Sequence, residues 1–396
     1  MANKGDIQHT LKSGSDASLY LTPVTSDGTI SVGTDMANVI KARMTGESIK
    51  GTIETLESNE LKSGRFASKK KLGNESANGN LDFEFSPDTF DALIESAWRG
   101  EFKAWTGDTE PNEYKIKSQW TDGSYRKYSD TLVESSLFGV GGLMPDLDKT
   151  NYKVSELKVG STPKEFDILR KIGGVPGEDL WQRYQRMGVN TFNINVDINS
   201  IVTGSFGFMG LNSPKRVDTN GIKTNVEEGY GSSSFSDSYT AETFVDGLEN
   251  VKSTNTDQFV STCGNLWING QNITWGQNIS IDLNNNLAQK YAIMVKKAIA
   301  TTSNKLDITG NYKSYVVKGK SEDVYNAAVD NETCEIMFIL QDKEDDPDKM
   351  YLFQVYKASF DAPDSNGNGT ESYDDSYGYT SFDEEAVRIL KIEKIA

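Results

Sequence analysis

Hydrophobic and polar residues alternate along much of the chain, which is the period-2 pattern of half-buried β-strands. The clearest case is 189–210, VNTFNINVDINSIVTGSFGFMG. Apolar residues at positions 192, 194, 196 and 198 alternate with Asn and Asp, and a polar Asn-Ser pair then breaks the pattern. After the break, Phe206 and Phe208 share one face with Gly204, so the segment predicts a β-hairpin. A small residue in a strand often marks close approach of another backbone, and we assign Gly204, Phe206 and Phe208 to packing between subunits.

Further strands are predicted from the same alternation in both halves of the chain. They lie at 18–22, 39–45, 48–56, 81–85, 157–171, 180–187, 279–283, 304–309, 334–340, 351–360 and 386–395.

Helical patterns are fewer and shorter. The first begins with Ser86 as N-cap and Pro87 in the first turn, places apolar residues at 90, 93, 94, 97 and 98 on one face, and ends at Gly100. A second helix is predicted over 321–329 and a third around 241–250. The fold class is therefore mainly β.

One arrangement occurs twice: a strand, a basic loop, a strand and a helix. Leu306 of NKLDIT stands 225 residues after Leu81 of GNLDFE. We interpret the chain as two β-sandwich or barrel-like modules, each with one packed α-helix. The predicted boundaries are an N-terminal arm at 1–38 that packs on another subunit, a first module at 39–211 with an insertion at 103–156, a linker at 212–263 and a second module at 264–396. The alternative for 264–396 is an immunoglobulin-like decoration domain, although such a sandwich needs no helix.

Three segments carry a family resemblance: 44–100, 157–174 (LKVGSTPKEFDILRKIGG) and 187–210 (MGVNTFNINVDINSIVTGSFGFMG). In this order they resemble siphophage major tail tube proteins, and the two modules resemble tail-tube modules. The resemblance implies a structural protein of a long, non-contractile tail that forms stacked rings and a hollow tube for genome passage. It also implies a tape-measure protein and a tail terminator as partners, and assembly in the host cytoplasm. Two modules per chain predict rings of three chains, whereas a decoration domain predicts six. The alternative function is a virion-surface or secreted β-sandwich adhesin.

Charge bears on the partners. The net charge of −17 opposes tight binding to a phosphate backbone, so DNA should pass without specific binding. Within this acidic chain, the segment 61–79 has one acidic residue and five basic ones. A second basic segment follows residue 287. We assign these basic side chains to ring stacking, with a merely solvated face as the alternative: Lys62, Arg65, Lys69, Lys70, Lys71, Lys290, Lys296 and Lys297.

Little in the sequence points to catalysis. A single histidine argues against nucleophilic triads and histidine metal sites, and two cysteines, Cys263 and Cys334, do not make a disulfide framework. We predict no enzyme activity, no cofactor, no secretory signal and no membrane span. One weak calcium-loop pattern remains, with a plain hairpin loop as its alternative: Asp364, Asn366, Asn368 and Asp375.

Overall fold

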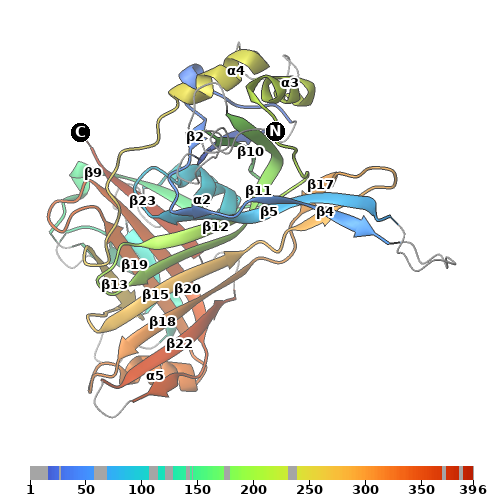
Figure 1. Ribbon diagram of the computed structural model, residues 1–396. Helices are drawn as coiled ribbons and strands as arrows, with labels where there is room; N and C mark the ends of the chain where they lie inside the picture. Colours follow the sequence, from blue (N-terminus) through green and yellow to red (C-terminus); the bar gives the residue numbers. More distant parts are fainter. Residues whose placement is uncertain are drawn as a thin grey trace, which may run out of the picture.

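The computed structural model describes residues 17–25, 28–57, 69–106, 115–120, 128–139, 143–144, 146–173, 179–230, 239–367, 372–382 and 387–395. Strands make up 50% of the chain and helices 13%, which confirms the mainly β class. Figure 1 shows one large antiparallel sheet that runs through the molecule, with α-helices at its margins. None of the helices in the described ranges is long and apolar enough to span a membrane.

The long strand β11 (Leu180–Asp197) is the centre of the sheet. It pairs with β12 (Thr203–Gly210) along 188–195 and with β15 (Gly276–Asn284) along 191–197, so these two strands lie on its opposite edges. The first part of β11 pairs with β10 (Glu165–Ile172). The predicted hairpin at 189–210 is confirmed.

The sheet continues from both edges of β11. Beyond β12 lie β5 (Lys71–Glu84) and then β4 (Lys50–Leu56). Beyond β15 lie β18 (Asp307–Tyr315), β22 (Asp374–Ser381) and β20 (Lys349–Phe360). Strand β20 pairs with β19 (Thr333–Gln341) and β23 (Val387–Lys394), and β23 pairs with β9 (Tyr152–Lys158).

The remaining strands are short or peripheral. They are β1 (Ala17–Val24), β2 (Ile40–Lys41), β3 (Gly46–Glu47), β6 (Lys103–Ala104), β7 (Lys115–Trp120), β8 (Tyr128–Ser136), β13 (Gly264–Ile268), β14 (Gln271–Asn272), β16 (Ala288–Lys290), β17 (Ala300–Thr302) and β21 (Asp364–Asn366). The described α-helices are α2 (Asp91–Trp98), α3 (Thr219–Tyr230), α4 (Ala241–Gly247) and α5 (Glu322–Val329).

The two halves of the chain share one core. Phe85, at the end of β5, packs its ring 5.3 Å from that of Tyr351 and 6.3 Å from that of Phe353, both on β20. β9, inside the expected insertion, is paired with the C-terminal strand β23. The strand–loop–strand–helix order does occur twice, with α2 after β5 and α5 after β18, but the two-module arrangement itself stays a prediction.

The predicted start of the first helix is wrong by one turn, because α2 begins at Asp91. The Ser86 hydroxyl bonds the Thr89 hydroxyl at 2.8 Å instead of capping the helix. Asp88 has a left-handed backbone (φ 61°), and its carboxylate pairs with Lys391 at 2.6 Å. The helix ends at Arg99, which adopts the left-handed conformation.

Gly100 serves close packing as well as the helix end. A Cβ on Gly100 would lie 2.4 Å from the carbonyl oxygen of Lys158 on β9. Only glycine permits this approach of the chain to the strand.

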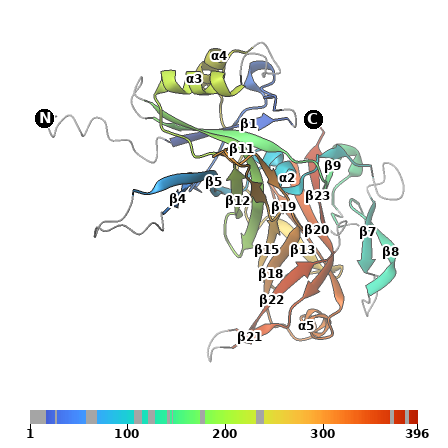
Figure 2. The same cartoon turned by 90° about the vertical axis from the view of Figure 1, so that its right-hand side faces the viewer.

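The helices α3 and α4 cover one end of the sheet and lie on the opposite side of the molecule from α5 (Figure 2). The sequence predicts α4, and the structure confirms it. The sequence does not predict α3, which lies in the expected linker. Ile222 and Val226 of α3 are fully buried with Trp181 of β11 in a second core cluster.

The described part of the expected N-terminal arm packs on its own chain. Strand β1 pairs with β10 over eight residues, and Leu19, Tyr20 and Leu21 are buried. The backbone groups of this segment therefore find their hydrogen-bond partners without a second subunit.

Gly204 generates a stability prediction. A Cβ at this position would lie 2.4 Å from the carbonyl oxygen of Asn193 and 2.5 Å from the ring of Phe83. Overpacking of this kind costs about 1–3 kcal/mol, so Gly204→Val should lower the free energy of unfolding by that amount in a urea titration. Ser205→Ala, one position along the strand, should cost less. Equal stability of Gly204→Val and wild type would show that the strand shifts freely at this point.

Candidate assembly surface

Two hairpins project together from one end of the sheet, which we call the hairpin end. The first is formed by β4 and β5, and Thr55 pairs with Leu72 in its outer part. The second follows β15 and is formed by β16 and β17, and Ala288 pairs with Thr302. Figure 1 shows both on the right, the first in blue and the second in orange.

The two hairpins contact each other directly. The backbone N–H of Glu75 on β5 donates to the carbonyl oxygen of Lys296 at 2.8 Å. The Tyr291 hydroxyl lies 3.4 Å from the carbonyl oxygen of Glu75, as its hydrogen-bond donor. The two basic segments predicted from the sequence therefore lie side by side although they are more than 200 residues apart.

The predicted stacking residues are solvent-exposed wherever the structure describes them. Lys69, Lys70 and Lys71 are exposed, and the Lys70 ammonium lies 2.7 Å from the carboxylate of Glu57. On the second hairpin, Lys290, Lys296 and Lys297 are exposed. Lys62 and Arg65 lie outside the described residues. The role of all eight in stacking stays a prediction.

The hairpin end also exposes large apolar side chains, which the sequence analysis missed. Ile293 is 90% exposed and Met294 100% exposed at the turn of the second hairpin, while Leu56 and Leu72 are 57% and 58% exposed on the first. Met294 also has a left-handed backbone, with φ 67°. The run YAIMV at 291–295 offered a signal, but exposure could not be deduced from it.

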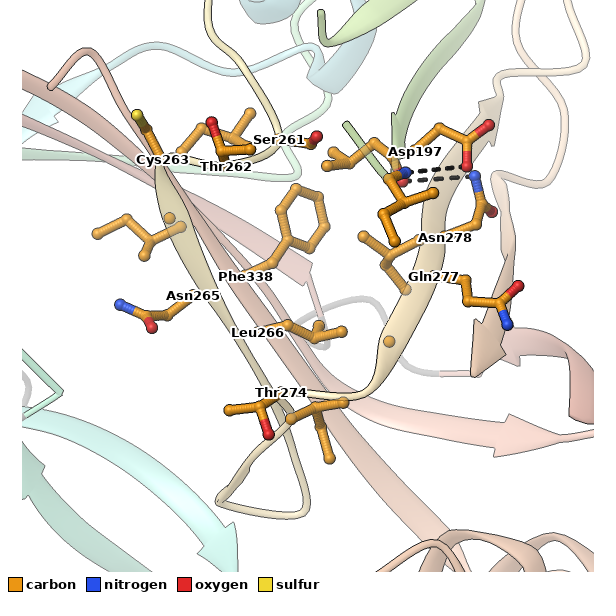
Figure 3. Close-up of a pocket in the computed structure, with 18 of the residues that line it drawn as sticks. Asp197, Ser261, Thr262, Cys263, Asn265, Leu266, Thr274, Gln277, Asn278 and Phe338 are labelled. Atoms are coloured by element: carbon orange, nitrogen blue, oxygen red, sulfur yellow. Dashed lines mark hydrogen bonds between the residues drawn. The ribbon is translucent and has the colours of Figure 1, made fainter. Parts of the chain in front are cut away.

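A pocket lies at the other end of the same strands. It opens beside the β11–β12 turn, between β13 and the first part of β15, and has a volume of about 290 Å³. Figure 3 shows Phe338 and Leu266 reaching into it, with Asp197 on one side and Cys263 on the other. Asp197 is the only charged residue among those that line it.

The residues assigned to subunit packing lie inside this chain. Phe206 is fully buried with its ring 4.8 Å from that of Phe83, and Phe208 is 3% exposed. The close approach predicted at Gly204 is an approach to Asn193 and Phe83 of the same chain. A contact of these residues with another subunit stays a prediction.

The calcium-loop residues have other partners in the structure. Asp364 and Asn366 lie on β21, which pairs with β22. Asp375 is buried and accepts hydrogen bonds from Ser365 at 2.5 Å and from Tyr377 at 3.2 Å. Asn368 lies outside the described residues, within which no cluster of three or more His, Cys, Asp or Glu side chains is placed to hold a metal ion. Calcium binding stays a prediction.

A comparison with protein families decides the identity. Residues 14–377 match the family model described as phage tail tube protein. The chain belongs to the phage tail tube protein family. It is a structural component of the virion tail, and the family is not enzymatic. No curated protein matches this tail tube protein. The match favours a tube protein over the adhesin alternative, and it implies self-assembly into a tube.

The two cysteines of this tail tube protein should differ in reactivity. Burial raises the pKa of the Cys334 thiol to about 12, whereas Cys263 is partly exposed at the pocket. A thiol with a raised pKa stays protonated, and its contribution to stability is present below its ordinary pKa and lost as the pH rises through about 12. At pH 8, a chromogenic disulfide reagent should therefore modify Cys263 rapidly in the unassembled protein and Cys334 only after denaturation. Equal rates would contradict the buried position of Cys334.

Proposed function

We propose that this tail tube protein builds the tube of a long, non-contractile tail as stacked rings, and that the hairpin end forms the contact between copies in successive rings. The observation that carries the proposal is the pair of adjacent projecting hairpins, which are basic and exposed in a strongly acidic chain. Copies with a net charge of −17 repel one another as they approach. A local basic surface that meets an acidic one offsets this repulsion and sets the orientation of docking.

Ring composition is the second part of the proposal. A projecting hairpin followed by a strand and a helix occurs in each half of the chain, and both hairpins leave at the same end. This duplication supports two tube modules per chain, so that three chains complete a ring. Closed rotational symmetry is the usual solution for a repeated interface.

The inside of such a tube would be traversed by DNA and, during assembly, by a tape-measure protein, with a terminator at the end. The acidic composition of the chain supports passage without specific binding, because binding to phosphates requires a surplus of Lys and Arg. The long, non-contractile class of the tail rests on the sequence resemblance.

Microscopy tests the rings directly. In a cryo-EM map of tubes assembled from the purified protein, we expect three chains in each ring. Six chains in each ring, with residues 264–396 outside the tube wall, would support the decoration alternative instead. A protein that forms no rings or tubes under any assembly condition would contradict the proposal as a whole.

Charge reversal tests the hairpin contact. The variant Lys69→Glu, Lys70→Glu and Lys71→Glu changes the net charge from −17 to −23. Its stability should stay within about 0.5 kcal/mol of wild type, because exposed positions tolerate such changes. Tubes should become shorter or absent in negative-stain images, and rising salt should weaken wild-type stacking in the same sense.

The matched control reverses three exposed lysines elsewhere, Lys149, Lys252 and Lys318, and reaches the same net charge. Tubes of normal length from the control, but not from the hairpin variant, would assign the effect to the hairpin. Equal shortening in both would assign it to net charge alone.

A further inference from the structure

The turn of the second hairpin, residues 291–295, has properties that its own chain does not explain; we call it the knob. Ile293 and Met294 are almost completely exposed, so their apolar surface gains nothing from burial. Met294 also adopts the left-handed conformation, which disfavours bulky side chains and favours Gly or Asn. Two unfavourable choices in one exposed turn indicate that these side chains are buried elsewhere.

The pocket at the opposite end of the sheet has complementary chemistry. Its inner surface is apolar, with Leu266, Ile279 and Phe338 among the lining residues. Its volume of about 290 Å³ is roughly twice that of a ~150 Å³ apolar cavity that admits benzene. It therefore has room for the side chains of Ile293 and Met294 together.

The charges around the two features are also opposite. The knob is flanked by three exposed lysines at 290, 296 and 297. The pocket has the carboxylate of Asp197 at its rim and no lysine or arginine in its lining. Approach of the knob to the pocket would bring an exposed positive group to this carboxylate.

The geometry of β15 excludes insertion of the knob into its own pocket. Gln277 and Asn278, at the start of this nine-residue strand, line the pocket, whereas Asn284, at its end, leads toward the knob. An extended strand rises about 3.3 Å per residue, so the two features lie at opposite ends of the sheet. A surface and its complement at two ends of one molecule form a head-to-tail contact, which can repeat from copy to copy.

We propose that the knob of one copy inserts into the pocket of a second copy, with Ile293 and Met294 buried against Phe338 and Leu266. This inference rests on the proposed function, since it names the surface on which the hairpin end docks. It identifies the occupant of the pocket as another copy of the same chain.

The pocket contains a native probe for the contact, because Cys263 lies at its rim and is partly exposed. Met294→Cys would place a second thiol on the knob. Tubes of this variant, oxidised and separated on a non-reducing gel, should give disulfide-linked multimers that disappear in the double variant Met294→Cys, Cys263→Ser. A ladder that stops at the ring size would place the contact within the ring, and a longer ladder along the tube; either result supports the pairing of knob and pocket.

A matched control puts an equally exposed thiol nearby but outside the knob, by Lys305→Cys. It should give no multimers. If Lys305→Cys cross-links to the same extent, or if the double variant still cross-links, the pairing of knob and pocket is wrong. If tubes form without any cross-linking through residue 294, the inference fails while the proposed function stands. Absence of tubes from the wild type would instead contradict the proposed function.

A second pair of variants guards against a variant that does not assemble. If Met294→Cys folds but builds no tubes, Ile293→Cys takes its place with the same controls. Independently, Ile293→Asp should leave circular dichroism and melting unchanged, because the side chain is exposed, and should abolish tubes. Normal tubes from Ile293→Asp would overturn the inference.

Discussion

Backbone hydrogen bonding along both edges of β11 is the constraint on which the rest of the fold depends. This 18-residue strand pairs with β12 on one edge and β15 on the other, and its first half pairs with β10. A buried backbone group without a hydrogen-bond partner is costly, so the register of β11 fixes the position of every strand beyond it. Phe192 and Ile194, both fully or almost fully buried on β11, reinforce this register. The same arrangement places the two hairpins at one end of the sheet and the pocket at the other.

The parts of this fold that local pattern determines were accessible from the sequence. Alternation identified β11, β12, β20 and β23, and the apolar stripe identified α5. Long-range contacts overrode local signals elsewhere. Asp88 is drawn out of the first helical turn by Lys391, some 300 residues away, so α2 starts later than its N-cap pattern predicts. Helix α3 was missed because its surroundings are polar, and its two buried residues, Ile222 and Val226, find their partners only in the tertiary structure.

The candidate site shows the same division. The basic residues of both hairpins could be predicted by their contrast with an acidic chain. Their adjacency could not, because it depends on one backbone contact between Glu75 and Lys296. The apolar knob was missed because the run at 291–295 has the composition of a buried strand, and only the tertiary structure shows that it is exposed.

The pairing of β23 with β9 has a consequence for synthesis of the protein. Arg388 lies opposite Lys158, which precedes it by 230 residues, and Val387 and Ile389 belong to the main core. Contacts so distant in the sequence form late, because a long loop must close first. The sheet is therefore incomplete until the residues up to 394 have emerged from the ribosome. A partly synthesised chain lacks a strand of its own core, and this dependence restricts incorporation into the growing tail to chains whose translation has passed that point.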